Sequence, residues 1–182
     1  MIRLAMCASV AVVLAAATVS AEPPRPLAPG DALPPLRGEF LNGRDAELPA
    51  AARGRVALLS LGFTYKSRFA VEEFSKRFQK EFAGRDDVTF FEVPMIGGMG
   101  RLAKVFIDRG MRNATPKEMH EHVITVYGGT GEWKARVGVR DEDAAYLVLI
   151  DREGRVQWVR GSRYDEKVFN DLKNATARLL EP

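Results

Sequence analysis

Cysteine, histidine and long hydrophobic runs are all scarce in this chain of 182 residues, which holds one cysteine, Cys7, and two histidines. An intramolecular disulfide or a dithiol exchange needs two thiols, so this sequence supports neither. No segment beyond the first 21 residues approaches the roughly 20 apolar residues that a membrane span needs. The 27 Lys and Arg against 24 Asp and Glu give a net charge of +3. Over a whole domain that charge is too weak to indicate a nucleic acid as partner.

The first 21 residues have the pattern of a secretory signal peptide. Arg3 supplies a short positive region, residues 4–17 form an apolar run, and Val19-Ser20-Ala21 place small residues where signal peptidase cleaves. An uncleaved N-terminal anchor is the alternative interpretation. Cleavage removes Cys7, so we expect an exported protein without a thiol, located in the periplasm or cell envelope of a bacterium.

The remaining chain is predicted to form one α/β domain at residues 36–182, after a proline-rich, extended and unpacked lead-in at residues 22–35. Continuous apolar runs predict buried strands, and apolar residues three or four apart predict helices. Alternating strands and helices followed by a strand hairpin imply a mixed central sheet with helices on both faces. We expect strands at 55–61, 88–93, 123–127, 146–150 and 155–159, helices at 68–82 and 101–109, and hairpin turns at Asn42-Gly43 and Asp151–Gly154. A final helix is expected to carry Val168, Phe169, Leu172, Leu179 and Leu180 on one stripe.

Three element boundaries are predicted from single residues. Pro94 is expected to end the strand at 88–93. Thr115-Pro116 suit the cap and first turn of a further helix. Ser162 and Asp165 are expected to form a capping box before the last helix.

The entry Gly30–Pro34 and the later run Gly54–Leu59, together with the order of elements, resemble the thioredoxin-like superfamily. The resemblance implies a three-layer sandwich. Members carry a redox Cys-x-x-Cys after the first central strand, but Gly62–Ser67 here contains no cysteine. They also carry a cis-proline before the strand of the terminal hairpin, where this chain has Ala144-Ala145. The resemblance therefore implies a non-redox member.

Within that superfamily, residues 136–180 resemble the mitochondrial F-type ATP synthase assembly-factor ("ATP ten") family. That family ends in a Gly-Tyr-x-Tyr-Leu-Leu-Asp strand and an Ile-Arg-Trp strand, to which Ala145–Asp151 and Arg155–Trp158 are similar, as is the following Gly161. The chain departs from the family in its export-type leader and in having Ala145 for the family's glycine. The resemblance implies an assembly factor or chaperone for a membrane complex such as ATP synthase, with a protein as partner.

Phe63, Thr64, Tyr65, Lys66 and Ser67 occupy the place where the thioredoxin-like fold carries its chemistry. Free backbone N–H groups at the start of a helix can hold an anion or a carboxylate. Tyr65 and Lys66 could present an aromatic ring and a charge to a partner. The alternative is that the five residues only connect a strand to a helix, which Ser67 caps.

Two other segments suggest a small ligand-binding or metal-binding protein, or an enzyme. The segment Gly98–Ala103, which overlaps the Gly97–Arg101 loop, matches the glycine-rich dinucleotide fingerprint, although it follows the second strand rather than the first, which favours a flexible connection. His120 and His122, with Glu118, could bind zinc if another segment supplied a third ligand, but solvated polar residues are the simpler interpretation. We therefore assign no catalytic residue, no metal and no cofactor.

Overall fold

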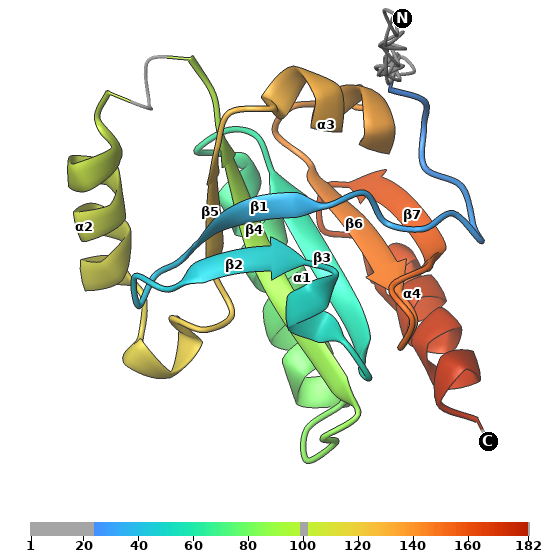
Figure 1. The fold of residues 1–182 in the computed structure, drawn as a ribbon. Helices are drawn as coiled ribbons and strands as arrows, with labels where there is room; N and C mark the ends of the chain where they lie inside the picture. The colour runs from blue at the N-terminus through green and yellow to red at the C-terminus, as the bar shows by residue number, and fades with distance from the viewer. Residues whose placement is uncertain (1–23, 99–101, 182) are drawn as a thin grey trace, which may run out of the picture.

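The computed structural model describes residues 24–98 and 102–181, so the predicted signal peptide lies outside the described residues. One seven-stranded mixed sheet has the strand order β2-β1-β5-β4-β3-β6-β7 (Figure 1). The central strands β3, β4 and β5 run parallel, and the outer pairs are antiparallel. The strands are β1 (Leu36–Phe40), β2 (Asp45–Leu48), β3 (Val56–Gly62), β4 (Val88–Ile96), β5 (Ile124–Tyr127), β6 (Ala145–Ile150) and β7 (Val156–Ser162).

Two hydrophobic clusters lie on opposite faces of this sheet, because successive strand residues point to opposite sides. Leu58 of β3 faces helices α1 (Ser67–Glu81) and α4 (Glu166–Leu180). Leu59 faces the other layer, which includes α3 (Thr130–Val137). Helices therefore cover both faces, and the predicted mixed α/β architecture is confirmed.

Both predicted hairpins are present. Gly43, with φ of 89°, lies in the turn that joins β1 and β2. Gly154, with φ of 81°, ends the turn between β6 and β7. A residue with a side chain rarely adopts these positive φ values, which explains why glycine marked both turns in the sequence.

The lead-in is extended, as expected, but it is packed against the domain, and there the prediction is wrong. The amide of Leu27 donates to the carbonyl of Arg136 over 2.8 Å, and that of Gly30 donates to Val156 over 2.7 Å. Leu33 is only 4% exposed. The proline-rich composition of the lead-in therefore prevents a helix, but it does not prevent the lead-in from pairing with the edge strand β7.

Strand β4 runs through Pro94 instead of ending there. Pro94 lies opposite Gly62, the last residue of β3, so the missing proline N–H falls where the β3 ladder stops. Met95 and the residue after it then pair with β5, starting opposite Val126.

The connection from β4 to β5 differs most from prediction. Helix α2 (Lys104–Ala114) begins and ends later than the predicted 101–109. Thr115 has an extended ψ of 131°, as the residue before a proline prefers, so Thr115-Pro116 terminates α2 instead of starting a helix. Only a short 3-10 turn, η3 (Lys117–Met119), follows.

The last helix, α4, is capped by one of the two residues that were predicted to do so. An Asp165 carboxylate oxygen accepts the backbone N–H of Val168 over 3.0 Å. Ser162 belongs to β7, and its hydroxyl donates to the carbonyl of Arg163, so the predicted capping box is wrong. Within the described residues, no helix has both the length and the hydrophobicity needed to cross a membrane.

Candidate functional site

The junction between β3 and α1 is fixed by a reciprocal pair of side chains. The Thr64 hydroxyl accepts the backbone N–H of Ser67 over 3.1 Å, and the Ser67 hydroxyl donates back to the Thr64 carbonyl over 2.8 Å. Thr64 also donates to a carboxylate oxygen of Asp143 over 2.9 Å. Ser67 is completely buried. Thr64 thus caps the helix, the role that the sequence had suggested for Ser67, and neither side chain is free to act as a ligand.

Phe63 also faces inward. It packs against the α3-side cluster, and its ring lies edge-on to Tyr146 with the centroids 5.8 Å apart. The ammonium group of Lys134 lies 5.8 Å from the same ring centre. Of the five predicted site residues, Phe63, Thr64 and Ser67 therefore build the junction, and Tyr65 and Lys66 point to solvent.

Tyr65 belongs to an exposed aromatic cluster. Tyr65 is 74% exposed and Phe69 is 58% exposed, and their rings meet edge to face at 6.4 Å. The guanidinium of Arg68 lies 4.5 Å from the Tyr65 ring centre and 4.9 Å from the Phe69 ring centre. We call Tyr65, Lys66, Arg68 and Phe69 the junction surface.

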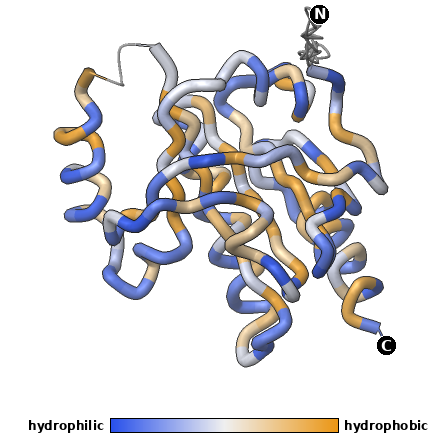
Figure 2. Tube along the Cα trace, in the orientation of Figure 1, coloured by the Kyte–Doolittle hydropathy of each residue, from blue (hydrophilic) through white to orange (hydrophobic). Residues whose placement is uncertain are grey.

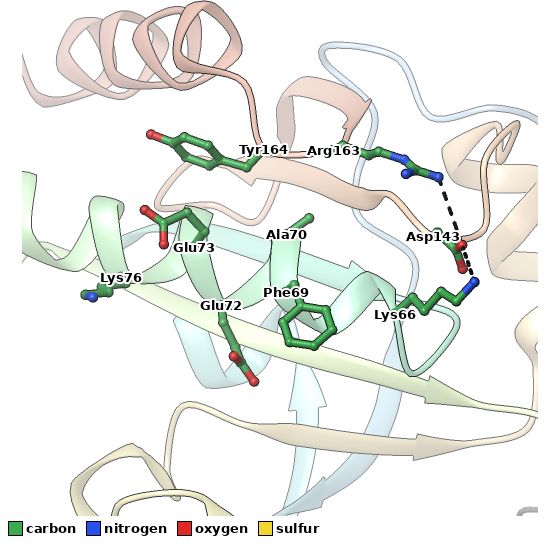
Figure 3. A pocket seen from close by; sticks show the side chains of 9 residues that line it. All are labelled: Lys66, Phe69, Ala70, Glu72, Glu73, Lys76, Asp143, Arg163 and Tyr164. Atoms are coloured by element: carbon green, nitrogen blue, oxygen red, sulfur yellow. Dashed lines mark ion pairs between the residues drawn. The ribbon is translucent and has the colours of Figure 1, made fainter.

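An open groove of about 720 Å³ continues from this surface between α1 and the loop that precedes α4 (Figure 3). Phe69 and Ala70 form part of its apolar wall, and Tyr164 stands on the opposite side. The charged side chains along the groove balance, with three cations against three anions: Lys66, Lys76, Arg163, Glu72, Glu73 and Asp143.

The positive charges at one end of the groove are held by Asp143. Lys66 lies 3.6 Å from its carboxylate and Arg163 lies 4.0 Å from it. Arg163 also bonds Asp141 over 2.8 Å, which holds the pKa of Asp141 below its usual value. Glu72, further along α1, has no ion pair among the described side chains. The groove therefore presents paired cations at one end and, further along α1, carboxylates without an ion pair among the described residues.

A partly buried carboxyl group lies beneath α1. Glu92 of β4 lies opposite Ser60 in the parallel ladder, on the face that α1 covers. Burial raises the pKa of Glu92 to about 7, and the negative charge of Glu72 adds to the shift, while a hydrogen bond with Ser75 opposes it. Ser60 and Ser75 are fully buried, with their hydroxyl oxygens 3.5 Å apart. An acidic residue inside an otherwise apolar strand was the sequence signal for this group.

The two histidines are not brought together by the fold. The Nε2 of His120 lies 3.0 Å from the carbonyl oxygen of Thr115, and the Nδ1 of His122 lies 3.0 Å from that of Phe90. The His122 ring also stacks on the Phe90 ring at 4.5 Å. Across residues 24–98 and 102–181, no three side chains of ligating type converge on one point. The described residues therefore offer no third ligand for the predicted pair.

The glycine-rich loop is only partly described, because residues 99–101 lie outside the described ranges. Gly97 packs closely against Thr130, whose hydroxyl would be 2.9 Å from an added Cβ. Gly98 has a positive φ of 57°.

Tyr146 and Gly161, which carried the resemblance in the terminal hairpin, touch each other. A Cβ at Gly161 would lie 2.4 Å from the Tyr146 ring. The Tyr146 hydroxyl accepts the backbone N–H groups of Arg140 and Asp141 over 2.8 and 3.0 Å. These residues fasten the loop that carries Asp143 to the sheet, so they shape the groove without lining it.

Five residues of the junction surface and the groove were not predicted from the sequence: Arg68 and Phe69 on α1, and Asp143, Arg163 and Tyr164. Phe69 was the one residue with a usable signal, because it lies four residues after Tyr65 and off the apolar stripe of the helix. Asp143, Arg163 and Tyr164 lie in loops that are distant from α1 in the sequence. Only the packing of β6, β7 and α4 brings these loops next to α1.

No protein-family model matches the sequence, and no curated protein is significantly similar. Many solved structures share the fold. A Chlorobium tepidum protein assigned as the thiol:disulfide interchange protein DsbE is 18% identical, with a TM-score of 0.59 over 85% of this chain and 99% of its own. The exposed lipoprotein thioredoxin Etrx1 of Streptococcus pneumoniae is 14% identical, with a TM-score of 0.55 over 78% and 98%. BsSco, of the Sco family of cytochrome c oxidase assembly proteins, is also 14% identical, with a TM-score of 0.54 over 83% and 97%.

These likenesses show the fold. The chain has a thioredoxin-like fold, and the predicted three-layer arrangement is confirmed. Several of the similar structures are thiol–disulfide proteins, whereas residues 22–182 of this chain contain no cysteine.

Proposed function

We propose that this protein is a thioredoxin-like binding protein that recognises a polypeptide through the junction surface and the adjoining groove, without a redox step. The observation that carries the proposal is the exposed cluster of Tyr65, Arg68 and Phe69 at the mouth of an open groove. Aromatic and arginine side chains are the types that most often dominate binding energy at protein interfaces.

The chemistry of the groove favours a polypeptide as the ligand. Its charges cancel, so it has no general attraction for a polyanion such as nucleic acid. Its volume of about 720 Å³ suits several side chains, and its open form admits an extended segment. The free carboxylate of Glu72 and the cations at Lys66 and Arg163 offer separate contacts for opposite charges on one partner.

Thiol–disulfide exchange has no chemical basis in this sequence. Disulfide exchange passes through a mixed disulfide and needs a second thiol to resolve it. The chain has only Cys7, within the predicted signal peptide. We therefore propose that the junction binds its partner without thiol exchange.

The partner we favour is a subunit of a membrane complex such as ATP synthase, with this protein as its assembly factor or chaperone on the outer side of the membrane. Support comes from the resemblance of residues 136–180 to the assembly-factor family and from the signal-peptide pattern of residues 1–21. One protein of similar fold, BsSco, belongs to a family of cytochrome c oxidase assembly proteins.

The test is affinity capture from solubilised membranes with three tagged proteins: the wild type, the double variant Tyr65→Ser/Phe69→Ser and the control Glu153→Ser. Glu153 is an exposed residue on the β6–β7 turn, outside the junction surface and the groove. We expect membrane-complex subunits to be enriched with the wild type and the control and lost with the double variant. Equal recovery with all three proteins would refute the role of the junction surface.

A further inference from the structure

Helix α2 is attached to the edge of the domain and turns its hydrophobic residues outward. It stands apart at one side of the molecule (Figure 1), and hydrophobic positions recur along it (Figure 2). Asp108 is its only buried residue. Phe106 and Val105 are 81% and 75% exposed, and Leu102, just before the helix, is 88% exposed. A soluble helix normally has the opposite arrangement, with its apolar stripe against the core.

This orientation is fixed by a polar network on the inner side of α2. The carboxylate of Asp108 accepts the Tyr127 hydroxyl over 2.6 Å and pairs with the Lys104 ammonium group over 2.6 Å. Lys104 also reaches Glu39 of β1 over 3.1 Å. A buried charge is stable only when it is paired in this way, so rotating α2 to hide its apolar residues would strand Asp108. The exposure of the apolar residues is therefore built into the fold.

The outer face combines hydrophobic and basic residues along one line. Residues three and four apart share a helix face, so Val105, Arg109 and Arg112 lie in a row with Leu102 and Phe106 beside them. Residues 102–117 contain four basic side chains and a single acidic one, the inward-facing Asp108. Arg112 is 3.9 Å from Glu39, and Arg109 has no ion pair among the described residues. We call Leu102, Val105, Phe106 and Arg109 the α2 ridge.

We propose that the α2 ridge docks on an anionic lipid surface, with its apolar side chains between the lipid chains and Arg109 at the headgroup phosphates. Helices that lie in a membrane interface carry this combination of Phe or Leu with Lys and Arg. The ridge is also small. A specific protein interface buries about 800 Å² per partner, whereas three side chains with one aromatic ring supply roughly half of that. A lipid surface needs no such complementary area.

This inference does not depend on the proposed partner. The α2 ridge would hold the domain at a membrane without a spanning helix. The described residues contain no helix that could span a membrane. Tyr65 and Phe69 lie on α1, outside the ridge, so the junction surface and the ridge can be disabled separately.

The first test is co-sedimentation of the full chain, as purified from an exporting host, with vesicles of phosphatidylcholine alone or mixed equally with phosphatidylglycerol. We expect binding to the anionic vesicles only, weakening as salt is raised. Phe106→Ser should reduce that binding by about tenfold to a hundredfold, the effect of withdrawing one aromatic side chain from an apolar phase. The matched control, Phe69→Ser, should bind as the wild type does.

The second test is independent of any membrane affinity of residues 1–21. In a Phe106→Trp variant, brominated lipid chains should quench the additional tryptophan emission relative to the wild-type spectrum, if this side chain enters the lipid. An unquenched signal overturns the proposal, as does equal binding of the wild type and Phe106→Ser. Self-association that disappears in Phe106→Ser, without vesicle binding, would assign the ridge to a second copy of the chain instead.

Discussion

Arg68 stacks on Tyr65, with its guanidinium carbon 4.5 Å from the centre of the ring. The two side chains leave the same turn of chain where β3 meets α1, and Phe69 completes the cluster. Stacking of this kind restricts three exposed side chains before any ligand arrives. A partner that binds them therefore loses less side-chain entropy, which favours recognition at this surface.

Removing the exposed rings should leave the fold intact. The double variant Tyr65→Ser/Phe69→Ser changes two side chains that are more than half exposed, and such substitutions usually alter the free energy of unfolding by less than about 0.5 kcal/mol each. Urea unfolding checks this expectation. A loss of several kcal/mol would mean that the cluster supports the domain and is not reserved for a partner.

The junction itself should be sensitive to loss of its cap. Thr64→Val keeps the side-chain volume but removes the oxygen that accepts the Ser67 amide and donates to Asp143. We expect a loss of about 1 kcal/mol in unfolding free energy. Thr64→Ser keeps the hydroxyl and should retain most of the stability. Equal unfolding midpoints for the valine and serine variants would show that the hydroxyl is not the cap.

Tyr146→Phe should destabilise the protein through a single oxygen atom. The substitution leaves the ring against Phe63 but deprives two backbone amides, those of Arg140 and Asp141, of their acceptor. A fully buried donor left without a partner costs about 1–3 kcal/mol, and these two amides are only partly buried, so we expect about 1 kcal/mol. Denaturant unfolding should show a loss of this size. Hydrogen exchange should place the added mobility in the loop that carries Asp143. An unchanged exchange rate there would contradict the fastening role of Tyr146.

The partly buried carboxyl of Glu92 should make stability depend on pH. Its pKa in the folded state is about 7, against 4.5 for the free side chain, so the folded protein retains a proton that the unfolded chain releases. Stability is therefore greatest below about pH 4.5 as far as this group is concerned, and it falls as the pH rises to about 7. The total change is up to about 3 kcal/mol.

Glu92→Gln should remove this decline and make the protein more stable than the wild type at about pH 8. Urea titrations on both sides of neutrality measure the difference. Glu72→Gln is the matched control, because it removes only the nearby charge and should lower the pKa of Glu92 slightly. A wild-type protein that is equally stable in mildly acidic and mildly basic buffer would disprove the burial argument.

Reducing agents should have no effect on stability. With Cys7 as its only cysteine, the chain cannot form an internal disulfide. The thermal midpoint should be the same with and without dithiothreitol, and the protein should not accelerate the reduction of insulin. Reductase activity that persists in a Cys7→Ser variant would contradict the non-redox proposal.

The sequence was informative where one local signal determines structure. Gly43 and Gly154 marked the hairpins because their positive φ values require glycine, and the apolar run of β3 is a strand buried on both faces. The β4–β5 connection was predicted poorly because Pro94 and Pro116 act through context. Pro94 is tolerated where the β3 ladder ends, and Pro116 makes the preceding residue end a helix.

The candidate site was predictable only in part, because some of its contacts depend on the tertiary structure and have no local sequence signal. Position along the chain pointed to Tyr65 and Lys66 because the superfamily places its chemistry after that strand. Nothing local indicates that Asp143 pairs with both Lys66 and Arg163. That proximity depends on β6 pairing with β3 and on the turn from β7 into α4, which are tertiary relationships.

The most direct test of partner recognition is photocrosslinking in living cells from one chosen position at a time. A photoreactive phenylalanine analogue at position 65 should give a discrete adduct containing a subunit of a membrane complex, ATP synthase being the one we favour. The same analogue at position 153, on the β6–β7 turn, should give no such adduct, and Phe69→Ser should abolish the one from position 65. Identical adducts from both positions, or none from position 65, would contradict the account.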